Sequence, residues 1–276
     1  MGNYASYIGK TDHQSDVITQ GLVERYRAVI GPDNMCGDIP YGLHWATCLP
    51  KAPMDELGQD GHPKTGGFLP ASTLPRRMWA SSKVEFLHPI NTGAKIERTS
   101  NIKSIKEKQG RSGALLFVDV EHVTEAAGTV CIRETQTIVY RDAPTAKGKL
   151  PTPKSISLDE WAFTKIVMPM PALLFRYSAL TFNTHRIHYD HDYAVNVEGY
   201  PALVVHGPLM ASLLLNFAME LADGGLLTSF QFRGLSPAFC GQALTLAANV
   251  DENEIDLSII GADGMKIMAA SAVIKR

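Results

Sequence analysis

The sequence contains few cysteines and no cysteine pattern that binds a metal. Its four cysteines, Cys36, Cys48, Cys131 and Cys240, are far apart in a chain of 276 residues, and none of them forms a C-x-x-C pair. Structural zinc sites use closely spaced cysteine or histidine ligands, and disulfide frameworks use a dense set of cysteines. The spacing therefore favours reduced thiols, a cytoplasmic location and no metal site.

The chain also lacks long apolar runs and a strong charge of either sign. No apolar segment approaches the roughly 18 residues of a membrane-spanning helix, and the N-terminus shows no signal or transit pattern. The formal net charge is −2, whereas nucleic-acid-binding proteins are usually basic. No glycine-rich loop leads from a strand into a helix. We therefore expect neither a membrane nor a nucleic-acid partner, and no nucleotide cofactor.

What the sequence does contain is a sizeable core and many strand patterns. Hydrophobic residues make up 45% of the chain and charged residues 20%, as in globular proteins, and the length suits one large domain or two ordinary ones. Alternating apolar residues, with glycines between the runs, predict consecutive antiparallel strands in both halves. The predicted strands are 79–87, 94–106, 115–124 and 130–140 in the first half, and 228–235, 243–250, 255–260 and 266–274 in the second.

A histidine-rich stretch at residues 177–209 separates the two groups of strands. It holds four of the nine histidines. Residues 175–182 precede its ionisable part and, being rich in aromatic residues, predict a strand. Apolar residues at helical spacing predict a helix at 209–221, and Pro208 suits its first turn. The start of such a helix, at Gly207, offers free N–H groups close to the histidines, a combination that chemistry at a carbonyl requires.

The first half begins differently. Residues 16–29 predict a helix, and residues 32–75 are rich in proline and glycine. A long irregular segment is unusual in a compact domain unless it covers or lines a site. This segment contains His44, Trp45 and His62, and a pair of arginines, Arg76 and Arg77, follows it.

A short motif repeats in the two halves. Pro89 and Gly93 follow the first strand of one half, and Pro237 and Gly241 follow the first strand of the other. Both pairs are separated by 148 positions (237 − 89 and 241 − 93). The repeat predicts an internal duplication in which a helix and an antiparallel sheet, an α+β arrangement, are used twice in one continuous sheet.

The ionisable residues resemble the signature of the MaoC-like, or R-specific, enoyl-thioester hydratases. That signature has the form D-x-N-P-x-H-x-D, followed after a loop by H-G at a helix start. The matching positions here are Asn183, His185, Arg186, His188 and Asp190, followed by His206 and Gly207. The chain departs from the family where Asn183 replaces the catalytic aspartate and His185-Arg186 replaces Asn-Pro.

The resemblance extends to the first half through the segments GFLPASTLPRRMWA and GRSGALLFVDVEH. It is strongest to the branch that contains mitochondrial-type 3-hydroxyacyl-thioester dehydratases and the itaconyl-CoA and mesaconyl-C4-CoA hydratases. It implies an α+β double hot-dog fold, in which each half wraps a sheet around a helix and which assembles as a homodimer or higher oligomer. The implied parts are an N-terminal hot-dog domain with the substrate pocket at 1–145, a linker at 146–172 and a C-terminal domain with the catalytic segment at 173–276.

The resemblance also assigns catalytic roles. His188 falls on the catalytic histidine, whose ordinary pKa suits proton transfer near neutral pH. Gly207 falls on the glycine whose N–H binds the thioester oxygen. Asn183 cannot act as a base but can hold a water. Asp190 is expected to orient the ring of His188, and His185 is the next candidate for catalysis.

Other residues are candidates for binding the substrate. His185 or Arg186 could bind the distal carboxylate of a dicarboxylic acyl group, although Arg186 could instead pair with Asp190. His206 either binds substrate or packs the turn. Arg76 and Arg77 are candidates for the phosphates of coenzyme A, because arginine binds phosphate in a bidentate manner, with solvated surface charge as the alternative.

The resemblance implies a hydratase that adds water reversibly to an α,β-unsaturated acyl-CoA, with a short C5 dicarboxylic substrate such as itaconyl-CoA or mesaconyl-C4-CoA. Coenzyme A is then part of the substrate, and no metal or redox cofactor is expected. The alternatives are a 3-hydroxyacyl-thioester dehydratase for longer chains, a hot-dog acyl-CoA thioesterase, and a non-catalytic acyl-thioester binder. The last is favoured by the replacement of the family's aspartate with Asn183.

Overall fold

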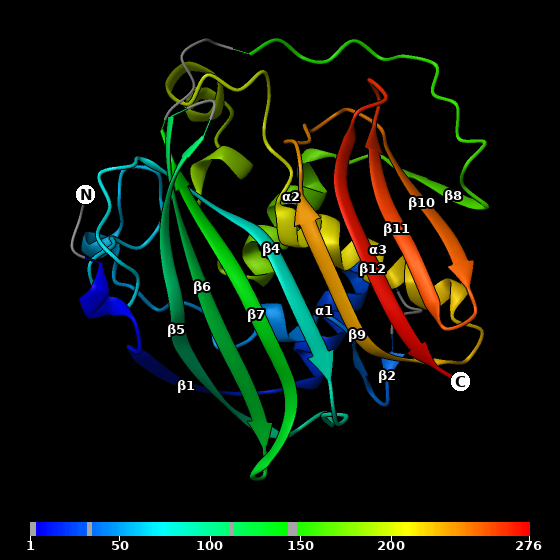
Figure 1. Ribbon diagram of the computed structural model, residues 1–276, viewed down its shortest axis with the longest axis horizontal. Helices are drawn as coiled ribbons and strands as arrows, with labels where there is room; N and C mark the ends of the chain where they lie inside the picture. The colour runs from blue at the N-terminus through cyan, green and yellow to red at the C-terminus, as the bar shows by residue number, and fades with distance from the viewer. Residues whose placement is uncertain (1–3, 32–34, 111–112, 143–147) are drawn as a thin grey trace.

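The computed structural model describes residues 4–31, 35–110, 113–142 and 148–276. A ten-stranded antiparallel sheet dominates it, in the order β1-β5-β6-β7-β4-β9-β12-β11-β10-β8, and the three α-helices lie on one face of this sheet (Figure 1). The strands are β1 (Thr11–Val17), β4 (Arg76–Phe86), β5 (Lys95–Gly110), β6 (Gly113–Ala126), β7 (Thr129–Arg141), β8 (Phe163–Val167), β9 (Leu226–Gly234), β10 (Leu244–Asp251), β11 (Glu254–Gly261) and β12 (Lys266–Lys275).

The helices differ in length and burial. They are α1 (Gln20–Ile30), α2 (Pro171–Leu180) and α3 (Gly207–Leu221), with short turns at η1 (Ala5–Tyr7), η2 (Leu43–Ala46), η3 (Met54–Glu56), η4 (Arg186–His188) and η5 (Tyr193–Val197) and a small hairpin of β2 (Met35–Cys36) and β3 (Ile39–Pro40). Helix α3 packs against β9, β10, β11 and β12, and its residues from Leu209 to Ala218 are all buried. Helix α1 packs against both α2 and α3.

The strand order shows that the two halves are equivalent and continuous. Each half contributes five strands, and the halves meet where β4 pairs with β9, at positions such as Ser81 with Arg233 and Glu85 with Ser229. In Figure 1 the cyan and green strands of the first half continue directly into the orange and red strands of the second. The predicted double hot-dog arrangement with one continuous sheet is confirmed.

The repeated sequence motif corresponds to repeated hydrogen bonds. The N–H groups of Leu87 and Leu235, just beyond β4 and β9, donate to the carbonyls of Cys131 and Ile267, both at 2.8 Å. The turns that follow are also alike, because Gly93 and Gly241 have φ angles of 87° and 80°, a left-handed conformation that glycine adopts without strain. The duplication inferred from the repeat is therefore visible in the backbone.

The central helix is present in only one half. Edge strand β1 leads into α1, as edge strand β8 leads into α2, so α1 and α2 are equivalent by position. Between α2 and β9 the second half carries the long helix α3. Between α1 and β4 the described residues of the first half contain only the β2–β3 hairpin and the turns η2 and η3. The helix that the first half was expected to wrap is thus degenerate, and α1 does not replace it.

The sheet of the first half extends beyond its helices and is covered by loop residues. A second hydrophobic cluster lies on β5, β6 and β7 and packs against Phe68, Leu69 and Leu74 from the proline- and glycine-rich segment. Its buried members are Ile102, Leu116, Val118, Val120, Ile138 and Tyr140. This segment therefore covers part of the sheet of the first half.

One predicted strand is a helix. Residues 175–182 fall mostly within α2, which begins with Pro171 in its first turn and buries Leu174, Tyr177 and Ser178 at helical spacing. The aromatic residues that suggested a strand do not alternate across two faces, since both Phe175 and Phe182 are more than half exposed. The prediction was wrong because aromatic content was given more weight than periodicity.

The start of one helix and two edge strands also differ from what was expected. Residues 16–17 end strand β1 instead of starting a helix, and α1 begins after Thr19, whose side chain caps it by accepting a hydrogen bond from the N–H of Leu22. Edge strands β1 and β8 were not predicted. Strand β8 lies inside the segment 146–172 that was expected to be a linker, and the expected domain boundary at residue 145 lies outside the described residues. No helix of the described chain is long and apolar enough to cross a membrane.

Candidate active site

A cavity of about 550 Å³ lies where the two halves meet. Its wall includes loop residues of the first half, the start of β4, the segment that follows α2, and the first turn of α3. Asn183, His185, His188 and Gly207, four of the five residues predicted to be catalytic, line this cavity.

The orientation of His188 is fixed by the backbone. His188 lies in η4, is 7% exposed, and its Nδ1 donates to the carbonyl of Val204 at 2.7 Å. Because a carbonyl only accepts, Nδ1 carries the proton, and Nε2 of the neutral ring is the acceptor. Burial lowers the pKa of His188 to about 4. At neutral pH the ring is therefore an unprotonated base on the cavity wall.

Gly207 provides a backbone donor to the same cavity. It is the first residue of α3, so its N–H has no partner within the helix, and the following Pro208 has no N–H. The positive end of the helix dipole lies here. A Cβ at Gly207 would lie 3.6 Å from the carbonyl of Trp79, an ordinary contact, so the fold alone does not require glycine.

Asn183 presents its amide group to the cavity as a donor. Its Oδ1 accepts a hydrogen bond from the N–H of His185 at 3.0 Å, which fixes which end of the amide is oxygen. The NH₂ group is the donor that the amide can offer to a ligand, and the oxygen keeps one further lone pair. An aspartate in this position could accept the same hydrogen bond with one oxygen and would present a second acceptor in place of the donor.

The histidines form a continuous row of rings. The ring of His185 lies 4.0 Å from that of His62 and 5.3 Å from that of His188, and His188 is stacked on His206 at 3.7 Å. Burial is the main cause of the lowered pKa values of His185, His188 and His206. His206 is fully buried, contacts Ser178 Oγ through Nε2 at 2.8 Å and is not among the residues of the cavity wall, so it packs against the far side of His188.

Asp190 and Arg186 pair with each other outside the cavity. The guanidinium of Arg186 donates to Asp190 Oδ2 at 2.7 Å and lies 4.1 Å above the ring of Tyr193. Neither residue lines the cavity. The expectation that Asp190 orients His188 is wrong, because Val204 does so. The expectation that Arg186 binds a distal carboxylate is also wrong, because Asp190 occupies its guanidinium.

The two arginines at the start of β4 have different surroundings. Arg76 is 9% exposed and forms an ion pair with Glu198 at 2.6 Å, so its charge is compensated inside the protein. Arg77 also lines the cavity, donates to the carbonyl of Pro63 at 3.4 Å and interacts with the hydroxyl of Tyr140, and no carboxylate of the described chain forms an ion pair with it. Arg77 is therefore available to an anionic ligand, whereas Arg76 is not.

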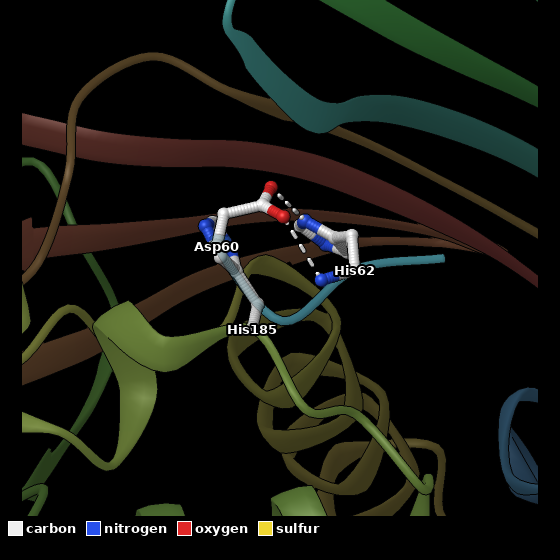
Figure 2. Close-up of side chains that lie close together, drawn as sticks. All are labelled: Asp60, His62 and His185. Atoms are coloured by element: carbon white, nitrogen blue, oxygen red, sulfur yellow. Dashed lines mark hydrogen bonds and ion pairs between the residues drawn. The ribbon is translucent and has the colours of Figure 1, made fainter. Parts of the chain in front are cut away.

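The sequence interpretation assigned no role to two residues of the cavity wall, Asp60 and His62. His62 Nδ1 contacts Asp60 Oδ2 at 2.8 Å, and the backbone N–H of His62 donates to Asp60 Oδ1 at 3.0 Å (Figure 2). The only sequence signal was a histidine within a proline- and glycine-rich segment. Nothing in the linear order indicates that residues 60 and 185, which are 125 positions apart, lie together.

Asp60, His62 and His185 are also the described residues that come nearest to a metal site, since their ligand atoms lie within 4.8 Å of one another. The rings of His62 and His185, however, are only 4.0 Å apart at 37°. Two imidazoles on one tetrahedral zinc, with Zn–N bonds of about 2.0 Å, hold their ring centres roughly 5 Å apart. The two rings would have to separate before they could bind one metal ion in this way.

A buried carboxylate lies elsewhere on the cavity wall. Glu134 on β7 is 4% exposed and accepts hydrogen bonds from Trp45 Nε1 and Ser82 Oγ, and His44 Nε2 lies 3.4 Å from it. Burial by itself would raise the pKa of Glu134, but the hydrogen bonds and the charge of His44 lower it overall. Protein donors satisfy the carboxylate of Glu134, which links the loop that carries His44 and Trp45 to strand β7.

Comparisons with known proteins agree with this fold. The sequence model of the hydroxyacyl-thioester dehydratase type 2 family matches residues 42–240, and the chain belongs to this family, within the hot-dog hydratases and dehydratases. A mesaconyl-C(4)-CoA hydratase from Chloroflexus aurantiacus is 40% identical over 273 residues, which cover 98% of this chain and 97% of that protein.

Solved structures support the fold. A MaoC-like dehydratase from Phytophthora capsici is similar with a TM-score of 0.72 at 15% identity, over 100% of this chain and 98% of that one. A conserved hypothetical protein from Mycobacterium tuberculosis, described as having a double hot-dog fold, is similar with a TM-score of 0.58 at 11% identity, over 97% and 96% of the two chains.

Proposed function

We propose that the protein is a hydro-lyase that adds water reversibly to the double bond of an α,β-unsaturated acyl-CoA. The observation that carries this proposal is that an unprotonated imidazole nitrogen, on His188, and an unpaired backbone N–H, on Gly207, face one cavity. Membership of the hydroxyacyl-thioester dehydratase type 2 family and the 40% identity to a hydratase support the same reaction.

The chemistry follows from these two groups. Water attacks Cβ of the enoyl thioester, and one of its protons passes to Nε2 of His188. The π electrons move toward the thioester carbonyl, and the N–H of Gly207 stabilises the resulting enolate oxygen, an interaction worth roughly 3 kcal/mol in comparable sites. The protonated His188, whose pKa of about 4 makes it a strong acid, then gives its proton to Cα. Hydrogen and hydroxyl have thus been added from one water.

The substrate that we propose is a short C5 dicarboxylic acyl-CoA, such as mesaconyl-C4-CoA or itaconyl-CoA. Its second carboxylate needs a cation inside the cavity, and Arg77 is a cavity arginine with no ion-pair partner among the described residues. Arg77 thereby replaces Arg186, and complements His185, as the candidate for this carboxylate. The name of the Chloroflexus relative agrees with such a substrate.

Longer acyl chains remain the alternative substrate class. The degenerate helix of the first half leaves a cavity of about 550 Å³, and the wall there includes the apolar residues Leu57, Leu69 and Ile138. A 3-hydroxyacyl-thioester dehydratase with a longer chain would use this space. Coenzyme A would be part of the substrate in either case, and we propose that no separate cofactor takes part. We further propose that the protein is cytoplasmic and forms a homodimer or higher oligomer. Residues 1–145 would form the pocket domain and residues 173–276 the catalytic domain.

An activity panel tests the proposed function. Purified protein is supplied with itaconyl-CoA, mesaconyl-C4-CoA, crotonyl-CoA and longer enoyl-CoA substrates, and hydrated products are separated and quantified. We expect hydration, with the dicarboxylic substrates preferred. A thiol reagent follows free coenzyme A in the same samples, because a thioesterase would release it and a hydratase would not. Binding without either product would identify a non-catalytic acyl-thioester binder.

A further inference from the structure

The water that attacks Cβ needs two hydrogen-bond acceptors. A water has two O–H bonds, and its lone pair points at Cβ only when both bonds are directed elsewhere. Nε2 of His188 accepts one of them. Asn183, the polar neighbour on the same segment, is the weaker candidate for the other, because its oxygen already accepts the N–H of His185 and its NH₂ group only donates.

A second acceptor is supplied by the loop that contains Asp60 and His62. Since Asp60 is a carboxylate, the contact between its Oδ2 and His62 Nδ1 requires the proton on Nδ1, which leaves Nε2 of His62 as an acceptor. Burial lowers the pKa of His62, so the ring is neutral at pH 7. Burial opposes the ionisation of Asp60, but the hydrogen bonds from His62 outweigh it and lower the pKa of Asp60, which is therefore charged. Its charge strengthens His62 as an acceptor.

The loop is attached to the catalytic segment at several points. The N–H of Arg186 donates to the carbonyl of Asp60 at 2.8 Å, and Thr184 Oγ1 donates to the carbonyl of Gly61 at 2.6 Å. Gly61 has a φ of 87°, and a Cβ there would collide with the carbonyl of Thr184, so the close approach requires glycine. These contacts hold His62 against the face of His185, beside His188, as Figure 2 shows for Asp60, His62 and His185.

We propose that His62, oriented by Asp60, is a catalytic residue that holds the attacking water together with His188. The oxygen of the water forms the bond to Cβ, one proton passes to His188 Nε2 and then to Cα, and the π electrons pass through the enolate into the new Cα–H bond. The second O–H bond remains intact, donates to His62 Nε2 throughout, and becomes the hydroxyl group of the product. This role rests on the proposed hydration reaction. It means that the first half of the chain supplies a residue that takes part in the chemical step.

The test is a coupling experiment between residues 62 and 183. His62→Gln should lower kcat about 10- to 100-fold and change KM less than threefold, because the lost contact is to water and not to the acyl-CoA. Asp60→Asn, which keeps the imidazole but no longer fixes its tautomer, should cause a smaller loss of kcat. Asn183→Asp introduces a new acceptor while one oxygen keeps the hydrogen bond to the N–H of His185. Introduced into the His62→Gln protein, it should restore kcat at least fivefold.

The controls separate this role from a structural one. His191→Gln, an exposed histidine of the same segment, should leave kcat unchanged, and circular dichroism and thermal unfolding should show that all variants are folded. The proposal is overturned if folded His62→Gln keeps wild-type kcat, or if Asn183→Asp changes kcat equally with and without His62. A wild-type protein that hydrates no thioester would instead refute the proposed function.

Discussion

The two halves of the chain share a sheet but differ in what the sheet encloses. In the second half, strands of eight to ten residues surround the 15-residue helix α3, whose residues 209–218 are all buried. In the first half, β5, β6 and β7 are 16, 14 and 13 residues long, but the described residues of that half contain no counterpart of α3. Loops and a cavity occupy the position of the missing helix.

The difference shows how the two halves of a duplicated fold can take different roles. The backbone hydrogen bonds that follow β4 and β9 are the same in both halves, so the scaffold has been kept. One half contains the helix whose N-terminus holds Gly207, and the described residues of the other have loops and part of the cavity wall in its place. The candidate active site lies between the halves because neither half contains both parts.

The largest expected effect tests whether α3 is the core of the second half. Leu214 is fully buried on α3, and Leu214→Ala should lower the free energy of unfolding by about 3 kcal/mol, through lost burial and the cavity that remains. Leu22→Ala on α1, where the side chain is 9% exposed, should cost less. Urea unfolding of both variants measures the difference. Equal losses would contradict the distinction between the two helices.

The next effect tests whether proton transfer belongs to the second half. His188→Ala should lower kcat for hydration on the order of 100-fold or more, because the cavity loses its backbone-oriented base. His122→Gln, on a strand of the first half that also reaches the cavity, serves as the matched control and should change kcat far less. Near-normal hydration by a folded His188→Ala protein would transfer the role to His185.

Most of the scaffold could be predicted from the sequence, because its signals are local. Eight strands and α3 follow from periodicity, and the repeat around Pro89 and Pro237 reveals the duplication. Edge strands β1 and β8 were missed because residues 11–17 and 163–167 are largely polar or exposed and lack an apolar face that alternates with a polar one. Residues 175–182, which fall mostly within α2, were predicted as a strand because aromatic content was given more weight than periodicity.

The site was predictable only in part. His188, Asn183 and Gly207 lie close together in the chain and match a motif, and all three line the cavity. The contribution of Asp60 and His62 depends on contacts between segments about 120 residues apart, which no local pattern encodes. The pairing of Arg186 with Asp190, four residues apart on one turn, was one of two open alternatives, and only the geometry decides between them.

A smaller effect tests whether the first half selects the substrate. Arg77→Gln should lower kcat/KM for mesaconyl-C4-CoA about 30-fold, the loss of one charge-assisted contact, and should leave crotonyl-CoA, which has no second carboxylate, nearly unchanged. Arg133→Gln, a half-exposed arginine on β7, is the matched control. If both substrates lose activity equally, Arg77 binds coenzyme A instead, and the acyl group is recognised elsewhere.

The smallest effect concerns the stability of the site itself. The folded state keeps His185, His188 and His206 neutral, since burial lowers the pKa of each, to about 4 for His188, whereas histidine in an unfolded chain has a pKa near 6.5. Between about pH 6.5 and pH 4 the unfolded chain therefore binds more protons than the folded one, and acid favours unfolding. Each such histidine adds at most about 1.4 kcal/mol per pH unit to the slope of the unfolding free energy.

His185→Gln should reduce this slope by up to about one proton, because glutamine does not titrate. Urea unfolding at pH 7, 6 and 5 measures the slope, and this window lies above the range in which most carboxylates titrate. An unchanged slope in His185→Gln would show that this ring is protonated equally in both states. It would then not be held neutral between His62 and His188, which its ring contacts with both histidines lead us to expect.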